Sequence, residues 1–172
     1  MNHAMSRCAA AWLLGASLVA APAWAGDSGF SLGLEGHGRT TLDDMGLPGF
    51  PGATPYSESH GDKAAVSLGA WAGLFGLRVD AMKFQVADSP ARVAAFYAKA
   101  LGRYGQVLDC REPAARVKPP KDQPDRLGCD DSAPQAGEYE YRVGTARQFR
   151  VVHVKPNGEG ARFDMARVVL GH

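Results

Sequence analysis

The sequence predicts an α+β fold, an antiparallel sheet of about five strands with one main amphipathic helix packed on one face. Three observations lead to this prediction. Residues 89–105 show the apolar spacing of a helix, the segments on either side alternate apolar and polar residues as strands do, and Asn157-Gly158 is typical of a hairpin turn. Successive strands joined by short turns are antiparallel neighbours, and the helix is expected to cover one face of the sheet they form.

The first 25 residues have the features of a secretory signal peptide. Arg7 supplies a positive charge, residues 9–21 form an apolar stretch, and Ala23-Trp24-Ala25 fits the pattern of a cleavage site. We therefore expect a periplasmic or secreted protein, cleaved after Ala25, with no stable membrane span after cleavage. An uncleaved membrane anchor is the alternative, although the apolar run is shorter than the roughly 20 residues that a span needs.

The composition excludes some classes of partner. The chain of 172 residues is 45% hydrophobic and 22% charged, which is typical of a globular domain. It has 19 Lys+Arg and 18 Asp+Glu, and loss of Arg7 with the leader would make the two numbers equal. A balanced charge does not favour nucleic acid or an anionic membrane surface as a partner.

The cysteines predict one disulfide. Cys8 lies in the leader, so Cys110 and Cys129 are the two that remain after cleavage. Because they lack the C-x-x-C spacing of metal and redox sites, an oxidising compartment is expected to join them in a structural bridge.

Residues 26–62 are rich in Gly, Pro, Ser, Thr and Asp, and their apolar residues have no sustained period. This composition predicts a flexible arm ahead of the folded domain at residues 63–172. Residues 31–34 alternate briefly, which leaves an edge strand open as an alternative. Turn signals at residues 48–52 flank Phe50, and we expect this aromatic ring to plug the edge of the core.

Residues 64–86 are expected to form strands. Val66, Leu68 and Ala70 alternate with small or polar residues, as in a strand with one packed face. From residue 77 onward the alternation continues. Apolar residues occupy the odd-numbered positions up to Ala81 and the even-numbered positions from Met82. This change predicts either a bulge or a strand that is buried on different faces along its length.

The helix is the clearest local signal. Ser89 is a natural N-cap, Pro90 suits the first helical position and Gly105 suits the residue past the end. The apolar residues that follow with helical spacing are Val93, Phe96, Tyr97, Ala100, Leu101 and Tyr104.

Beyond the helix we expect a short strand, a long loop and three further strands. The short strand is residues 106–110, and five prolines make residues 111–137 an irregular loop that the disulfide would tie down. The last three strands are predicted at residues 139–143, 149–154 and 162–170, the final two joined by a hairpin turn.

Two stretches of this pattern carry a resemblance. Phe50-Pro51-Gly52-Ala53 precedes paired strands, and Asp88-Ser89-Pro90 precedes Val93 and Phe96-Tyr97. The chain resembles an uncharacterised family of exported bacterial domains with a Pro-Gly-Ala turn and an Asp-Ser-Pro-capped Phe-Tyr helix. The similarity covers roughly residues 48–170. It implies the fold and export, and it carries no site residue across.

Motifs for catalysis and for metal binding are incomplete. Gly26-Asp27-Ser28-Gly29 is similar to the nucleophile motif of trypsin-like proteases, but it opens the mature chain and lacks a preceding base. Gly36-His37-Gly38 lacks the third glycine of a dinucleotide loop. The histidines form no metal-binding pair at helical spacing. We therefore predict no catalytic residue, no metal ligand and no cofactor.

Three functional hypotheses remain. The first is an exported, non-enzymatic binding or envelope-associated module for an unknown envelope protein or small ligand. Its best candidate surface is the face shared by Tyr139 and Tyr141, provided that the helix leaves it uncovered. The second is a small periplasmic hydrolase or transferase with a site assembled from scattered residues such as His153, Asp130 and Asp131. The third is a structural partner subunit that docks by a sheet edge.

Overall fold

The computed structural model describes residues 32–37, 40–72, 75–130 and 132–171. The expected signal peptide, the first residues of the expected arm and the motif around Ser28 lie outside this part of the chain.

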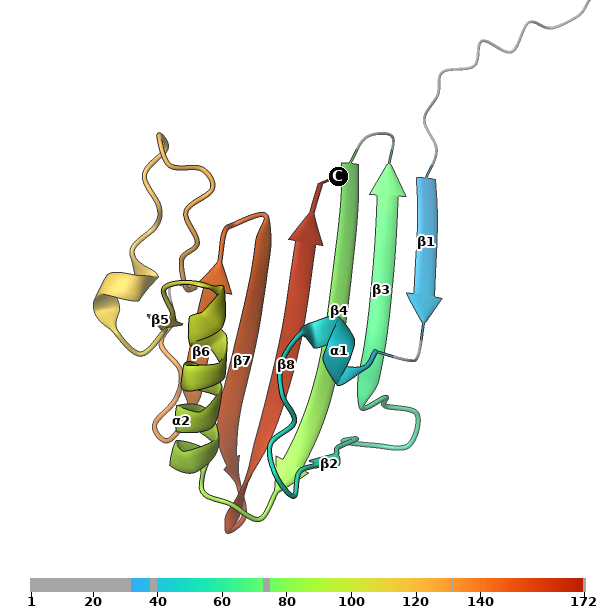
Figure 1. The fold of residues 1–172 in the computed structure, drawn as a ribbon, viewed down its shortest axis with the longest axis vertical. Coiled ribbons are helices and arrows are strands. Elements are labelled where there is room, and N and C mark those ends of the chain that lie inside the picture. Colours follow the sequence, from blue (N-terminus) through green and yellow to red (C-terminus); the bar gives the residue numbers. More distant parts are fainter. Residues whose placement is uncertain (1–31, 38–39, 73–74, 131, 172) are drawn as a thin grey trace, which may run out of the picture.

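An antiparallel sheet forms the centre of the fold (Figure 1). Its strands are β1 (Leu32–His37), β2 (Thr54–Pro55), β3 (Ala65–Ala72), β4 (Phe75–Val86), β5 (Leu108–Asp109), β6 (Tyr139–Gly144), β7 (Gln148–Asn157) and β8 (Gly160–Leu170). The order across the sheet is β1-β3-β4-β8-β7-β6-β5, and the short β2 pairs with β4. The α+β class and the antiparallel sheet are confirmed, and the sheet is larger than the five strands expected.

One face of the sheet carries the helices (Figure 1). The main helix, α2 (Pro90–Leu101), continues into a short 3-10 turn, η1 (Gly102–Tyr104), and packs on β6, β7 and β8. The side chain of Ser89 caps it by accepting from the backbone N–H of Arg92, with Pro90 at the start, as the sequence predicted. None of the helices in the described ranges is long and apolar enough to cross a membrane.

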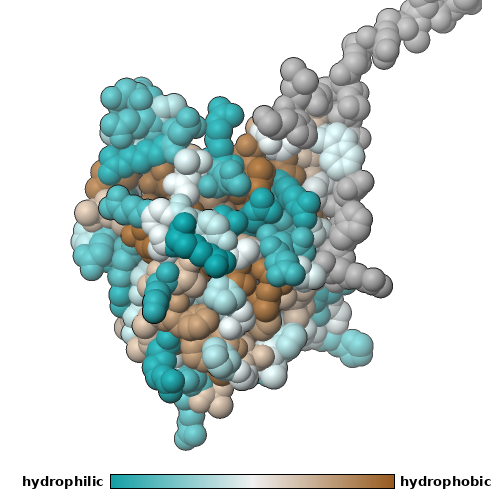
Figure 2. Space-filling view, viewed as in Figure 1, coloured by the Kyte–Doolittle hydropathy of each residue, from teal (hydrophilic) through white to brown (hydrophobic). Residues whose placement is uncertain are grey.

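The hydrophobic core lies between α2 and the sheet. Phe163 of β8 is fully buried at its centre, with its ring 5.3 Å from that of Phe84 and 5.2 Å from that of Tyr97. Burial raises the pKa of the Tyr97 phenol, whose hydroxyl donates to the carbonyl of Pro48 at 3.2 Å. Seen from the helix side, polar side chains surround the remaining apolar patches (Figure 2).

The predicted flexible arm differs from the structure over residues 40–62. Thr41 and Asp44 form a reciprocal capping box that starts a short helix, α1 (Leu42–Met45). Met45 is 0% exposed and Leu47 3%, so this segment belongs to the core. Phe50 is buried as expected, with its ring 5.1 Å from that of Phe96. Composition alone suggested mobility because the apolar anchors are few and irregularly spaced.

Two carbonyls at the end of α1 accept hydrogen bonds from side chains of β7 and η1. Arg150 donates from Nε to the Met45 carbonyl at 2.8 Å, and Arg103 and Tyr104 both donate to the Gly46 carbonyl. Gly46 has a φ of 64° and ends the helix in the left-handed region. These bonds satisfy helix-end carbonyls that would otherwise lack partners.

Strand β4 explains the change of parity in the sequence. It pairs with β8 in one unbroken register, from Leu77 opposite Leu170 to Val86 opposite Ala161. There is no bulge, so the second alternative holds: the strand is apolar on one face in its first half and on the other face in its second half. The first half therefore turns its apolar side chains away from α2.

The turn between β7 and β8 is where the sequence placed it. Asn157 pairs with Gly160, and Gly158 takes a φ of 60° in the connection. A positive φ at this position is what the Asn-Gly signal predicts.

A disulfide joins Cys110 to Cys129, whose Cα atoms are 5.5 Å apart. It closes the loop beside β6, which contains a second 3-10 turn, η2 (Pro113–Arg116), and an isolated bridge between Arg126 and Thr145. The loop is otherwise irregular, as its prolines predicted.

Replacing Cys110 with serine is expected to lower the free energy of unfolding by roughly 3 kcal/mol, because the open chain regains the entropy of a loop of about 19 residues. Chemical denaturation under oxidising conditions measures this loss. The same variant under reducing conditions is the control, since both proteins then lack the bridge. Equal stability under oxidising conditions would contradict a stabilising disulfide.

Candidate functional site

The face of the sheet opposite α2 is apolar over most of its area. Side chains alternate along a strand, and Phe163 and Met165 of β8 point into the core, so their neighbours Asp164 and Ala166 point the other way. We call this second side the open face. Its apolar residues on β3, β4, β8 and β7 are Val66, Leu68, Ala70, Ala72, Phe75, Leu77, Val79, Ala81, Ala166, Val168, Leu170, Phe149 and Val151.

None of these open-face side chains is fully buried, in contrast to those under α2. Leu68 is 50% exposed and Phe75 is 60% exposed. Both α1 and α2 lie on the other side of the sheet (Figure 1). Large exposed apolar residues are ordinary when single, but a continuous patch of them marks an interaction surface.

The open face is organised in rows that cross the strands. One row is Leu68, Val79, Val168 and Phe149, in which each residue is paired with the next in the sheet register. The row beside it is Val66, Ala81, Ala166 and Val151. Each row has one residue from β3, β4, β8 and β7 in that order.

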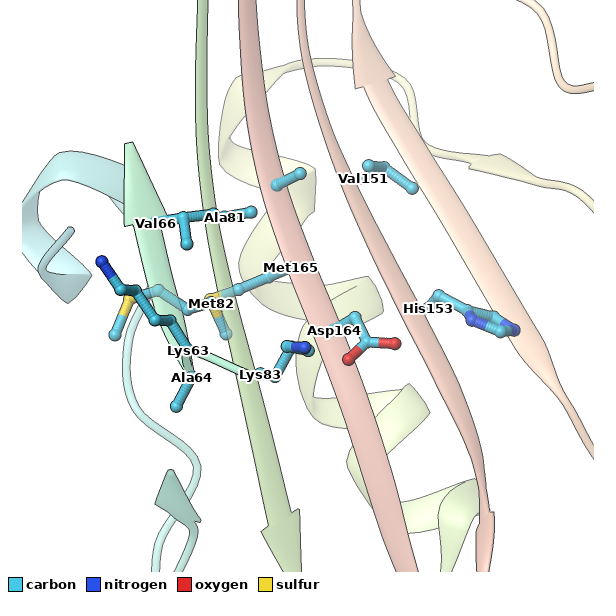
Figure 3. A pocket seen from close by; sticks show the side chains of 11 residues that line it. Lys63, Ala64, Val66, Ala81, Met82, Lys83, Val151, His153, Asp164 and Met165 are labelled. Carbon is cyan, nitrogen blue, oxygen red and sulfur yellow. The ribbon is translucent and has the colours of Figure 1, made fainter. Parts of the chain in front are cut away.

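A shallow hollow of about 220 Å³ lies on the open face (Figure 3). It forms over Ala81 and Ala166 because their side chains are small, and Val66 and Val151 stand on its two sides. Polar residues stand at one end of the hollow, namely Lys63, Lys83, His153 and Asp164.

The polar end of the open face is bordered by residues 56–63. Lys83 on β4 contacts the Asp62 carboxylate, with Nζ 2.6 Å from Oδ1. Arg162 on β8 donates to the Tyr56 hydroxyl at 3.2 Å and pairs with Glu58 at 2.5 Å. These contacts fasten the segment between β2 and β3 to the sheet.

The contact between Asp62 and Lys83 gives a pH-dependent prediction. The hydrogen bond from Lys83 is the main cause that lowers the pKa of the Asp62 carboxyl. Because the pKa of Asp62 is lower in the folded than in the unfolded chain, the contact stabilises the fold at pH values above the unfolded pKa. This contribution is lost as the pH falls through the pKa of the folded state. We expect Asp62→Asn to be less stable than the wild type at neutral pH and equally stable in strong acid.

Thermal unfolding of both proteins from neutral to strongly acidic pH tests this expectation. Asp43→Asn is a suitable control, because Asp43 lies outside the segment that borders the open face. A difference between Asp62→Asn and the wild type that stays constant with pH would contradict the ion pair.

The described residues suggested for an enzyme each contact a different partner. Nε2 of His153 lies 3.3 Å from Oε2 of Glu138, whereas Asp130 pairs with Arg142 at 2.7 Å. The hydrogen bond from Arg142 lowers the pKa of Asp130 and so favours its charged form. The carboxylate is thus already bonded to an arginine. Asp131 lies outside the described residues. His153 and Asp130 therefore each have a partner within the chain.

The tyrosine face is on the helix side. Tyr141 is 8% exposed and belongs to the core under α2, and the guanidinium of Arg111 stacks on the ring of Tyr139 at 4.3 Å from its centroid. The condition set for this surface, that the helix leaves it uncovered, is not met. The surface left uncovered by the helices is the opposite one.

One buried charge was missed in the sequence. Asp80 of β4 is 0% exposed, accepts from the Ser67 hydroxyl at 2.6 Å and pairs with Nε of Arg78 at 2.9 Å. Arg167 approaches the same carboxylate at 3.8 Å. The signal was an acidic residue inside a strand with an arginine two positions away, which is also what an exposed strand face would show. Asp80 lies on the helix side of the sheet, and its carboxylate is already bonded to Ser67 and Arg78.

No cluster of three or more metal-binding side chains occurs among the residues that the structure describes. Comparison of the chain with family models, with curated proteins and with solved structures gives no match.

Proposed function

We propose that this protein is an exported, non-enzymatic binding module and that the open face is its binding surface. The observation that carries the proposal is the continuous apolar area on a face that neither α1 nor α2 covers. Polar side chains border this area at one end, and two of them already have partners: Lys83 contacts Asp62, and His153 contacts Glu138.

The size of the open face supports a binding role. Four strands at a spacing of about 4.8 Å and seven residues at a rise of about 3.4 Å give a flat area on the order of 500 Å². The largest apolar patch on a typical monomer is about 300–600 Å² and is often functional. Leaving such an area in water costs free energy, so its retention favours a partner that covers it.

The chemistry of the open face also favours binding over catalysis. An enzyme site needs titratable groups that converge on a reacting atom within a cleft that excludes water. Here the hollow is shallow, its floor is alanine and valine, and the charged groups stand at one end. Export is supported by the leader-like N-terminus and by the disulfide between Cys110 and Cys129.

Binding of an environment-sensitive apolar dye at high dilution tests the proposal. Folded wild-type protein should increase the dye fluorescence, and Leu68→Lys should reduce this signal because it places a charge inside the apolar area. Val117→Lys is the matched control: Val117 is 66% exposed but lies in the disulfide-closed loop. Equal dye binding by the two variants would place the apolar surface elsewhere and overturn the proposal.

A further inference from the structure

We infer that the partner of the open face is a second copy of this chain, packed face to face as a two-sheet sandwich. The inference rests on the proposed function, since it names the occupant of the same surface. The twofold axis would run along the strands, between β4 and β8, in the plane that separates the two sheets.

The first support is the order of side-chain sizes in each row. Across the line between β4 and β8, one row reads Val66, Ala81, Ala166, Val151, which is the same in both directions. A rotation about this line lays β3 over the β7 of the second copy and β4 over its β8. Each valine of one copy would then meet a valine of the other, across a hollow shared by the alanines.

The neighbouring row has the same symmetry of size. It reads Leu68, Val79, Val168, Phe149, with large side chains outside and valines inside. The exposed Leu68 of one copy would pack against Phe149 of the other. A twofold interface requires one patch to be complementary to itself, and these two rows meet that requirement.

The second support is the charge at the polar end. Lys83 on β4 and Asp164 on β8 are direct neighbours on opposite sides of the proposed axis. The same rotation places Lys83 of each copy over Asp164 of the other, so opposite charges meet twice.

The third support is shape and area. Small-ligand pockets have volumes of about 300–1,000 Å³ and enclose most of the ligand, whereas this hollow is about 220 Å³ and open. A stable interface buries about 800 Å² of accessible surface per partner. The flat area of the open face, on the order of 500 Å², is a large part of that value, and its protruding side chains add accessible surface. Two twisted sheets pack face to face at about 30°. A flat apolar sheet is therefore a better occupant than a small molecule.

Sedimentation velocity of the exported, disulfide-bonded protein over a wide concentration range tests the inference. We expect the wild type to form a dimer that dissociates on dilution. Leu68→Lys should dissociate at a protein concentration at least tenfold higher than the wild type does. Val117→Lys should dissociate like the wild type. Circular dichroism and a cooperative melt of each variant confirm that loss of the dimer is not loss of the fold.

A charge exchange tests the orientation. Asp164→Lys should weaken the dimer because Lys83 of each copy would face a lysine, and the double variant Lys83→Asp with Asp164→Lys should restore it. A folded double variant that remains monomeric would overturn the proposed axis. A thermal melt of each variant is the control for contacts within one chain, because Lys83 and Asp164 are also cross-strand neighbours there and Lys83 contacts Asp62.

The outcomes separate this inference from the proposed function. A monomer at every concentration would overturn the second copy as partner. If that monomer still binds the apolar dye in a manner that depends on Leu68, the open face remains the binding surface for another protein. If it neither assembles nor binds the dye, both proposals fail.

Discussion

Replacing Phe163 with alanine is expected to lower the free energy of unfolding by about 3–5 kcal/mol. The ring is 0% exposed and lies between the rings of Phe84 and Tyr97, with Phe50 6.5 Å away. Its removal leaves a cavity where the sheet, α2 and the segment after α1 meet. Chemical denaturation measures the loss, and the slope of the transition shows whether unfolding stays two-state.

Phe149→Ala is the matched control for this prediction. Phe149 is the same residue type in the neighbouring strand, but it lies on the open face. At a dilution where the chains are separate, its removal should cost less than about 1.5 kcal/mol, because little packing is lost. Equal losses for the two variants would mean that the open face is packed within the monomer, and would contradict the proposed function.

Asp80→Ala is expected to lower the free energy of unfolding by about 3 kcal/mol, because the arginines that face this buried carboxylate would lose their counter-charge. The value is at the lower end for buried pairs, since Arg78 is 54% exposed and regains water. Denaturation at neutral pH measures the effect.

Asp88→Ala is the control for the buried carboxylate. Asp88 pairs with Arg92, whose side chain is 76% exposed, so the variant should lose no more than about 1 kcal/mol. A loss for Asp80→Ala that is no larger than that for Asp88→Ala would show that the network around Asp80 does not stabilise the fold.

Local signals in the sequence predicted the helix, the last three strands and the disulfide well. Ser89, Pro90 and the apolar spacing that follows determine α2 through capping and packing, which act within a few residues. The hairpin between β7 and β8 is also local. By contrast, α1 is held by arginines more than 50 residues away, and no local pattern reveals such contacts.

The sequence predicted the apolar residues of the open face only in part. Val66, Leu68 and Ala70 alternate as predicted, but alternation shows that a strand has an apolar side and does not show which side the helix will cover. The change of parity at Ala81 and Met82 was the relevant signal. It indicates that the two halves of β4 have their apolar side chains on opposite faces of the sheet. A sheet covered only by the helices on one face would not need apolar side chains on the other face.

Hydroxyl-radical footprinting of the unmodified protein tests the central claim most directly, because it measures the accessibility of each side chain in solution without any substitution. After correction for intrinsic reactivity, Leu68 and Phe75 should be protected at high protein concentration and become accessible on dilution, while Val117 should stay accessible throughout. Exposed fractions of 50% and 60% for an isolated chain set the expected limit at dilution. Oxidation of Leu68 and Phe75 to that limit at every concentration would contradict the claim that the open face is covered by a partner copy.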